Sequence, residues 1–379
     1  MNWSAIRRAL ALSTVLLLAG GGDDVRAASP SAETPPTPPI TAAERPYLQQ
    51  IVRIDPLVHV LMQRPSTLPA AVSNVMVIEQ ADGLVLVDSG NSMGSGRRVV
   101  ELVRTISRKP VKAVIISHWH PDHTMGLAAI VAAWPGVEVI ATAATRDHML
   151  GESQKTLPKA PDPEWDRTRV AQLETYKTQD FGVDLTVPAI RQGVEAARAY
   201  LDLRQRDAPG GYIVAPTRTF TDRLVLADPL APIELAFLGK GDTDGDAVVW
   251  LPRQRILSAG DVVAAPVPYG FTTFQAEWIA LLTRLKAYDF KVLVPGHGEV
   301  QRDTAYIDLL IGLITRVRTE VPPLASQGLS YEEVAKRLDF SNERRAFVGD
   351  DPWLGAWFDS YAVQALIAAA WTATTGKPV

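Results

Sequence analysis

The sequence contains no cysteine among its 379 residues. This absence excludes disulfide bonds and removes thiolates from the side chains that could bind a metal ion. It also excludes lipid attachment, because residues 18–21 have the form of a bacterial lipoprotein cleavage box but carry Gly21 where the lipidated cysteine would stand. Histidine is scarce as well, with six in the chain, so a cluster of histidines is informative.

The composition does not favour a nucleic-acid partner. The formal net charge is −4, and 47% of the residues are hydrophobic against 21% charged. This length and apolar content exclude disorder of the whole chain and fit one large α/β core, or one core with an added lobe. A net negative chain is not attracted to phosphate backbones, so nucleic acid is not an expected partner. The expectation of a small-molecule substrate rests on the histidine motif at residues 118–123. The oligomeric state stays open.

The first residues have the features of a secretory signal. Arg7 and Arg8 precede an apolar run at residues 9–19 that is too short to cross a bilayer, and Ala27 ends a small-residue cleavage site. We expect residues 1–27 to be a signal peptide and residues 28–48, which are rich in proline, to be a linker. The mature protein is then expected to be periplasmic or secreted, without a stable membrane anchor.

The most informative stretch is residues 114–126, where an apolar strand runs into a loop with four potential metal ligands. These are His118, His120, Asp122 and His123, so half of the histidines of the chain lie in this loop. Neutral imidazoles and carboxylates are ligands of Zn²⁺ and similar divalent ions, and a loop that folds back can bring them to one point. The alternative is a polar loop that only caps the strand, which leaves the clustering of imidazoles without a cause.

Strands and helices alternate around this motif. Apolar runs predict strands at residues 57–61, 75–78, 84–87, 114–116 and 137–140, and helices at residues 97–106 and 127–133. This βαβ order implies a largely parallel sheet covered by helices. Further strands are predicted at residues 233–238, 247–251, 255–261 and 292–294, with a turn at Pro252 between the second and third of these.

Residues 147–211 interrupt the alternation with a charged stretch that is too long for an ordinary connection. Its apolar residues Ile190, Val194, Ala197 and Leu201 recur at helical spacing. We predict a helical insert that packs near the mouth of the site and influences substrate choice. A purely structural flap fits the pattern equally well.

Residues 303–379 predict a helical C-terminal extension. Helical patterns occupy residues 306–319 and 331–338, and one last helix is expected to hold Trp353, Trp357, Phe358, Tyr361 and Trp371. Aromatic residues at helical spacing usually belong to a core, so we expect these to pack, with a dimer or substrate face as the alternative.

At the histidine motif the chain resembles the metallo-β-lactamase superfamily, whose members carry a His-x-His-x-Asp-His run after a strand. The resemblance covers roughly residues 57–302 and implies that residues 49–302 form an α/β fold, a four-layer αβ/βα sandwich. It extends to Asp261 and His297, each at the end of a predicted strand, and to a Gly-x-Thr-x-Gly element at residues 241–245. Each feature alone is weak, but their order along the chain is specific.

The resemblance implies two metal positions that share one acid. It assigns His118, His120 and Asp242 to the first metal, Asp122, His123 and His297 to the second, and Asp261 to a bridge between the two.

Asp242 is the departure from the family pattern, because most members have a histidine at this position. It is either a ligand or a bystander, and Asp244 or Asp246 would take its place if the register of the loop were shifted. The Gly-Asp-Thr-x-Gly register favours Asp242.

The implied cofactors are two Zn²⁺ ions per chain. A carboxylate at position 242 cancels positive charge and makes the harder ions Mn²⁺ and Fe²⁺ more competitive. Two such ions ionise a bound water near neutral pH, so the implied reaction is hydrolysis of an ester, lactone, thioester or amide through a metal-bound hydroxide. Asp122 is the expected catalytic residue, which orients the hydroxide and takes up a proton.

Other functions stay open. The histidine run and the missing cysteine are similar to the cysteine-free β-lactamases, but that subgroup lacks an acid equivalent to Asp261, which is typical of hydroxyacylglutathione hydrolases and acyl-homoserine lactonases. Two alternatives from other classes are an iron-dependent oxygenase of the persulfide dioxygenase kind and a non-catalytic metal-binding protein. Metal content, oxygen consumption and a substrate panel discriminate them.

Four more residues lie in or near these elements. The resemblance implies that Asp88, at the end of a strand, orients the ligand loop through hydrogen bonds, and the alternative is that it caps the next helix. Trp119 is expected to stiffen the loop. His59 is expected to be a packed strand histidine and His148 a surface histidine on a helix, because isolated histidines are more often of this kind than ligands.

The substrate pocket is predicted between the loop at residues 63–69, residues 268–271 and the helical insert. Tyr269 is the expected hydrogen-bond donor to a substrate oxygen, because tyrosine carries its hydroxyl on a rigid ring.

Overall fold

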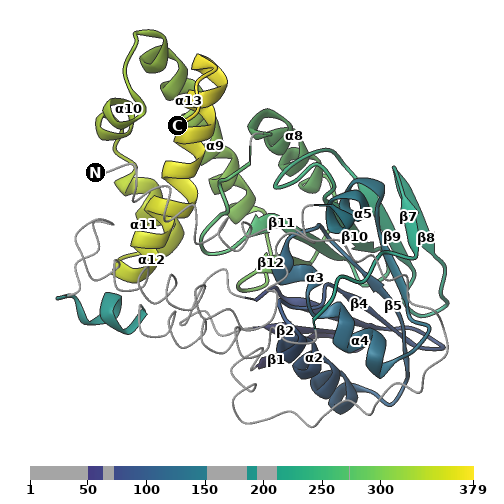
Figure 1. The fold of residues 1–379 in the computed structure, drawn as a ribbon. Helices are drawn as coiled ribbons and strands as arrows, with labels where there is room; N and C mark the ends of the chain where they lie inside the picture. Colours follow the sequence, from purple (N-terminus) through teal and green to yellow (C-terminus); the bar gives the residue numbers. More distant parts are fainter. Residues whose placement is uncertain (1–49, 63–71, 152–185, 194–210, 273) are drawn as a thin grey trace.

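A computed structural model describes residues 50–62, 72–151, 186–193, 211–272 and 274–379. The predicted signal peptide (1–27), the linker (28–48), the loop at 63–69 and most of the predicted insert lie outside these residues and stay predictions. Figure 1 shows two sheets with helices outside them, and the C-terminal helices, in yellow-green and yellow, at one end of the molecule.

The first sheet has seven strands in the order β1-β2-β3-β4-β5-β6-β7. They are β1 (Gln50–Asp55), β2 (Val58–Met62), β3 (Val75–Glu79), β4 (Leu84–Val87), β5 (Val111–Ile115), β6 (Glu138–Thr142) and β7 (Arg218–Phe220). Strands β1 to β4 pair antiparallel, and β4 to β7 pair parallel. The parallel half contains the predicted βαβ alternation.

The second sheet has five strands in the order β12-β11-β10-β9-β8. They are β8 (Arg223–Leu226), β9 (Ile233–Phe237), β10 (Ala247–Leu251), β11 (Ile256–Ala264) and β12 (Val292–His297). All neighbours pair antiparallel except β11 and β12, which pair parallel. The prediction that Asp261 ends its strand is wrong, because the apolar residues after it continue β11 and Ala264 pairs with His297.

Three strands have no counterpart among the predicted ones, and all three are edge strands. β1 and β7 are the two edges of the first sheet, and β8 is one edge of the second. Their side chains are largely half-buried or exposed. An edge strand buries only part of its surface, so it leaves a weak apolar pattern in the sequence.

The two sheets face each other across a shared core. Inner-facing residues of the first sheet, such as Val60 and Ile78, pack in one buried cluster with Leu235 and Val294 of the second. Side chains alternate along β3, since Met76 and Ile78 belong to this inner cluster, whereas Val75 and Val77 belong to the cluster on the outer face.

Helices cover both outer faces. Helices α2 (Met93–Ile106) and α4 (Leu127–Ala133) pack on the first sheet, and α8 (Gln275–Leu285) and α9 (Ala305–Ser326) pack on the second. Two short helices, α3 (Pro121–Thr124) and α5 (Ala143–Leu150), follow β5 and β6. The order helix, sheet, sheet, helix confirms the predicted four-layer α/β sandwich.

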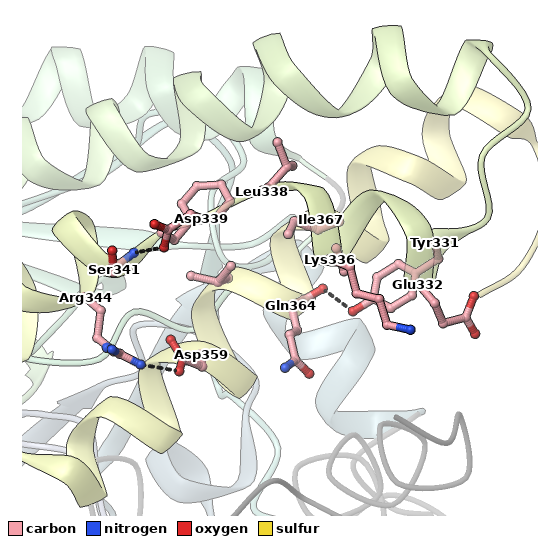
Figure 2. A pocket seen from close by; sticks show the side chains of 13 residues that line it. Tyr331, Glu332, Lys336, Leu338, Asp339, Ser341, Arg344, Asp359, Gln364 and Ile367 are labelled. Atoms are coloured by element: carbon pink, nitrogen blue, oxygen red, sulfur yellow. Dashed lines mark hydrogen bonds and ion pairs between the residues drawn. The ribbon is translucent and has the colours of Figure 1, made fainter.

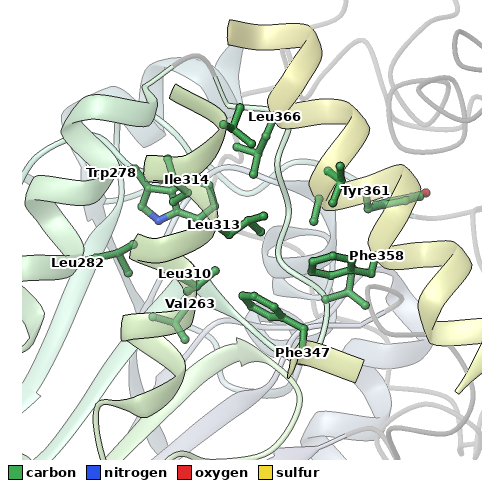
Figure 3. Packing of buried hydrophobic residues seen from close by; sticks show 14 of the residues in the cluster. Val263, Trp278, Leu282, Leu310, Leu313, Ile314, Phe347, Phe358, Tyr361 and Leu366 are labelled. Carbon is green, nitrogen blue, oxygen red and sulfur yellow. The ribbon is translucent and has the colours of Figure 1, made fainter. Parts of the chain in front are cut away.

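The C-terminal region is helical, as predicted. It continues from α9 through α10 (Tyr331–Arg337), α11 (Ser341–Val348), α12 (Pro352–Trp357), the π-helix η3 (Phe358–Gln364) and α13 (Ala365–Thr375). Figure 3 shows how Phe347 and Phe358 pack with Leu310 and Leu313 of α9 beside Trp278 of α8. The packing role predicted for the aromatic residues is confirmed for Phe358, which is fully buried.

The predicted last helix is confirmed, since α12, η3 and α13 form one unbroken helical run over residues 352–375. Within it the hydrogen-bond register widens to that of a π-helix at residues 358–364. Helix α11 was absent from the prediction, since only Phe347 and Val348 of its eight residues are buried and its apolar signal is correspondingly weak.

A hollow of about 330 Å³ lies between α10, the start of α11, η3 and α13. Figure 2 shows Lys336 and Glu332 on one side of it and the ion pair between Arg344 and Asp359 on the other. None of the candidate metal ligands lines this hollow. Among the residues that the structure describes, no helix has the length and apolar character needed to cross a membrane.

We expect Gly312→Ala and Gly296→Ala to change stability in opposite directions. Gly312 is exposed in α9 with no atom within 4 Å of an added Cβ, so alanine should stabilise the protein by about 1 kcal/mol. An added Cβ at Gly296 in β12 would lie 1.9 Å from Asp261 Oδ1, so alanine should displace β12 or Asp261 and lower the melting temperature. Thermal unfolding followed by circular dichroism measures both, and a stabilising Gly296→Ala would contradict the expectation.

Candidate metal centre

Seven histidine and aspartate side chains from loops and strands of both sheets converge. Residues 118–123 follow β5, Asp242 lies between β9 and β10, and Asp261 and His297 belong to β11 and β12. Their potential ligand atoms form two groups, each of which fits within 4.8 Å. The first group contains His118, His120, Asp242 and Asp261, and the second contains Asp122, His123, Asp261 and His297. These are the sets implied by the family resemblance, with Asp261 in both.

In the first group Asp242 lies between two imidazoles. Its Oδ2 is 3.4 Å from His118 Nε2 and 3.2 Å from His120 Nδ1. The Asp261 Oδ2 atom is 3.8 Å from His118 Nε2. All four side chains therefore direct a nitrogen or an oxygen toward one point.

In the second group Asp122 and Asp261 flank two imidazoles. His297 Nε2 is 3.0 Å from Asp122 Oδ2 and 3.4 Å from Asp261 Oδ2. His123 Nε2 is 3.3 Å from Asp261 Oδ1 and 3.5 Å from Asp122 Oδ2. Asp261 thus directs Oδ2 toward the first group and carries both oxygens close to the second, which is the arrangement that a bridging ligand requires.

Several of these atoms are buried without a hydrogen-bond partner. They are His123 Nε2, both carboxylate oxygens of Asp242 and Asp261 Oδ1. A buried polar atom without a partner costs about 1–3 kcal/mol, and a charged one costs more. Such a cluster is unfavourable unless it shares a cation, and four imidazoles with three carboxylates suit two divalent ions. The residues present therefore fit the metals that the family resemblance implies.

The pKa values of the histidines separate the two groups. Burial lowers the pKa of His120 to about 4, and burial with the nearby His123 and His120 lowers that of His118 well below its ordinary value. Burial also disfavours the charged forms of His123 and His297, but the surrounding carboxylates outweigh it and raise the pKa of His297 to about 9. The first group therefore offers neutral nitrogens, and the second attracts positive charge.

The pKa values of the two central carboxylates, Asp242 and Asp261, shift in opposite directions. Burial, then the charges of Asp261 and Asp246, raise the pKa of Asp242 well above its ordinary value. Burial opposes ionisation of Asp261 too, but His297 and His123 overcome it and hold its pKa well below the usual range. A cation in the first group would relieve the repulsion between the two carboxylates.

Asp88 orients the ligand loop, which confirms the first of its two predicted roles. Its carboxylate accepts hydrogen bonds of 2.8 Å from both the backbone N–H and the hydroxyl of Ser117, and His123 Nδ1 lies 2.8 Å from its Oδ2. An imidazole that donates from Nδ1 keeps Nε2 available for a metal. The alternative role is filled by Ser92, which caps α2 in a capping box.

Asp246 holds the loop that carries Asp242. Its buried carboxylate accepts hydrogen bonds from the backbone N–H groups of Gly241 (3.0 Å) and Thr243 (3.1 Å) and from the Thr243 hydroxyl (2.5 Å). Burial raises the pKa of Asp246 to about 7 in spite of these bonds. This supporting role was missed because the sequence favoured Asp242 as the ligand but gave no indication of what the Asp246 carboxylate would contact.

His148 and Trp119 have contacts that the sequence did not indicate. His148 lies on α5 at the surface, as expected, but its Nε2 is 2.9 Å from Asp244 Oδ1 and its ring stacks on Trp119 with centroids 5.0 Å apart. The Trp119 ring also meets His120 edge-on at 4.7 Å. Asp244 is thus engaged with His148, which favours Asp242 as the ligand.

Tyr269 and His59 differ in their distance from the centre. The Tyr269 ring packs edge-on against His120, with centroids 5.4 Å apart, and its contact with substrate stays a prediction. His59 lies half-buried within β2, opposite Arg53 and Val77, and belongs to neither ligand group.

Two facing sheets with histidine and aspartate groups that could hold metal ions are the architecture of metallo-β-lactamase-like proteins. The family model of the metallo-beta-lactamase superfamily matches residues 68–297, more than half of the chain. The chain belongs to this superfamily.

The relatives of known name include an alkylsulfatase and a metallo-beta-lactamase. A linear primary-alkylsulfatase of Pseudomonas sp. is 26% identical over 284 residues, which cover 69% of this chain and 49% of the relative. A type 2 metallo-beta-lactamase of Bacillus sp. is 24% identical over 237 residues, which cover 61% of this chain and 68% of the relative.

Among solved structures, the stereoselective inverting sec-alkylsulfatase Pisa1 of Pseudomonas sp. superposes with a TM-score of 0.60 at 19% identity. The match covers 86% of this chain and 50% of that protein. This likeness shows the fold. The chain spans about half the length of both alkylsulfatases that it matches.

We expect Asp242→Ala to lose one metal ion or to bind it more weakly, because the change removes a direct ligand. Elemental analysis after dialysis measures the metal content per chain. Asp244→Ala is the matched control, because Asp244 lies two residues after Asp242 but its carboxylate contacts His148. Loss of metal from Asp244→Ala, with full retention by Asp242→Ala, would show that the assignment is wrong.

We expect Asp88→Asn to lower metal affinity by about 10- to 100-fold, because an amide has one acceptor oxygen in place of two, so either the Ser117 N–H or the Ser117 hydroxyl and His123 Nδ1 lose their acceptor. Competition with a chelating dye measures the affinity. Ser92→Ala serves as the control: it removes the cap of α2, should cost about 1 kcal/mol of stability and should leave metal affinity unchanged. Unchanged affinity in Asp88→Asn would count against the orienting role.

Proposed function

We propose that this chain is a metal-dependent hydrolase that binds two divalent cations. Zn²⁺ is the favoured ion, and Mn²⁺ and Fe²⁺ are the alternatives. The observation that carries the proposal is the pair of ligand groups that share the buried Asp261. His118, His120 and Asp242 would hold one cation, and Asp122, His123 and His297 would hold the other. Bound cations of this kind supply Lewis acidity and an ionisable water near neutral pH.

The exposed side of the centre indicates where a substrate approaches. The side chains of Asp122 and His120 are 23% and 15% exposed, whereas those of the other five candidate ligands are at most 5% exposed. Asp122 therefore offers a carboxylate at the entrance that can take up and return a proton. Tyr269 stands on the same side through its contact with His120 and can donate its hydroxyl to a substrate oxygen.

The substrate class follows from the site and from the named relatives. A centre of this kind suits hydrolysis of an ester, lactone, thioester or amide. Likeness to an alkylsulfatase over 69% of the chain adds sulfate esters as a specific candidate, and likeness to metallo-beta-lactamases keeps the β-lactam amide. We also propose that the protein acts outside the cytoplasm, on the basis of the signal-like residues 1–27.

The test measures metal content and turnover on the same preparation. A strong chelator should abolish hydrolysis of at least one member of a panel of aryl esters, lactones, thioesters, alkyl sulfates and β-lactams, and added Zn²⁺, Mn²⁺ or Fe²⁺ should restore it.

Asp122→Asn should lose most of the turnover on the same substrate, since an amide cannot take up a proton at neutral pH. Full turnover by the metal-free protein would refute the proposal. Bound metal without any turnover would favour a non-catalytic protein, and oxygen consumption with a persulfide would favour the oxygenase.

A further inference from the structure

A row of aromatic rings leads from the metal centre into the C-terminal helices. Tyr269 packs against the candidate ligand His120 and lies 6.3 Å, centroid to centroid, from Tyr361 of the π-helix η3. Tyr361 in turn lies 4.4 Å from Trp357. Phe271 joins the row between Tyr269 (4.7 Å) and Tyr361 (5.4 Å). We call Tyr269, Phe271, Tyr361 and Trp357 the aromatic row.

Backbone contacts hold the loop of Tyr269 and Phe271 against the C-terminal helices. The Gly270 N–H donates to the Tyr361 carbonyl at 2.8 Å, and a Cβ at position 270 would lie 2.6 Å from the Ala362 carbonyl oxygen. The Gln275 side chain donates to the Leu366 carbonyl at 2.8 Å. The loop that carries Tyr269 is therefore set by the π-helix, a type of element that often occurs at functional sites.

Burial distinguishes the row from an ordinary core. Tyr361 is buried, but Tyr269, Phe271 and Trp357 are each only half-buried. Trp357 also packs against two different apolar clusters, that of the second sheet with the C-terminal helices and that of the first sheet. The half-buried rings thus form a row that begins at His120, one of the two most exposed candidate ligands of the centre.

The far end of the row reaches the described part of the predicted insert. Trp357 lies 5.7 Å from Trp353, and an added Cβ at Gly193 would lie 2.2 Å from the Trp353 ring. Ile190 belongs to the same apolar cluster as Trp353. The row therefore runs from the metal centre to the insert without a charged residue among its rings.

We propose that the C-terminal helices complete the substrate pocket, and that the aromatic row binds the straight apolar chain of a substrate whose scissile ester lies at the metal centre. This inference rests on the proposed hydrolase function. Flat apolar rings at contact distance from one another offer a continuous surface for methylene groups but no charge for a polar chain. The substrate is then an ester of a medium-length alkyl or acyl chain.

Binding is tested first, without turnover. Calorimetry of the metal-loaded protein with straight-chain carboxylates of two to ten carbons should show affinity that rises by about threefold per added methylene. Trp357→Ala and Phe271→Ala should cut the ratio of the affinities for the longest and shortest chains by at least about tenfold, and Trp357→Phe, which keeps a ring, should retain most of it.

A matched control lies in the same helical region. Lys336→Ala changes the hollow between α10 and α13 and touches no ring of the row, so it should leave the dependence on chain length unchanged. Far-UV circular dichroism and metal content confirm that each variant is folded and loaded. Tyr361 is avoided as a first target because its burial makes a folding defect the expected result of truncation.

Hydrolysis of esters with the same leaving group and increasing acyl length is the second measurement. The ratio of kcat/KM for octanoyl to acetyl esters should fall by at least about tenfold in Trp357→Ala. Affinity that does not depend on chain length, or variants that keep the full dependence, would overturn the inference. Chain-length-dependent binding without any turnover would support the row and refute the proposed hydrolase, so the two failures are distinguishable.

Discussion

The metal centre depends on one carboxylate, that of Asp261, buried between two groups of imidazoles. Its oxygens lie 3.3 Å and 3.4 Å from nitrogens of the second group, and Oδ2 lies 3.8 Å from His118 of the first. An ionised carboxylate in this position needs positive charge on both sides, and the same charge must offset the neighbouring Asp242. Burial and charge therefore both favour the proposal of two cations, for which the two ligand groups offer places.

The scaffold around the centre keeps these charges in place. Asp88 and Asp246 are not candidate ligands, yet each gathers several hydrogen bonds and fixes the loop that bears a ligand. Asp88 has a φ of +65°, which is strained for a residue with a side chain. The strain is tolerated because its carboxylate satisfies Ser117 and orients His123 at the same time. The ligands and their supports come from three connections, those after β4, β5 and β9, and from the strands β11 and β12.

The C-terminal helices are part of the same architecture. Their apolar cluster includes the outer face of β11 and the helix α8, so the strand that carries Asp261 and the π-helix that meets Tyr269 share one core. The hydrogen bonds from Gly270 to Tyr361 and from Gln275 to Leu366 join the segment after Asp261 to these helices. A region past the family match at residues 68–297 thus contacts the loop beside His120.

The sequence by itself determined the ligand types, their order and the βαβ frame, because an imidazole and carboxylate run after an apolar strand is local chemistry that a pattern reports directly. It predicted the buried strands β9, β10 and β12 and missed the edge strands β1, β7 and β8, whose half-exposed side chains leave little periodic signal.

Only the tertiary structure decided what Asp244 and Asp246 contact, and which rings stand beside the centre. The family register favoured Asp242 among the three acids, but the partners of the other two depend on the folded loop, which turns Asp246 onto N–H groups of the loop and Asp244 toward His148. Gln275 and Leu366 are 91 residues apart, and their hydrogen bond exists because two helices pack on one core. A periodic pattern reports that a side chain is buried, whereas its partner depends on how distant faces meet.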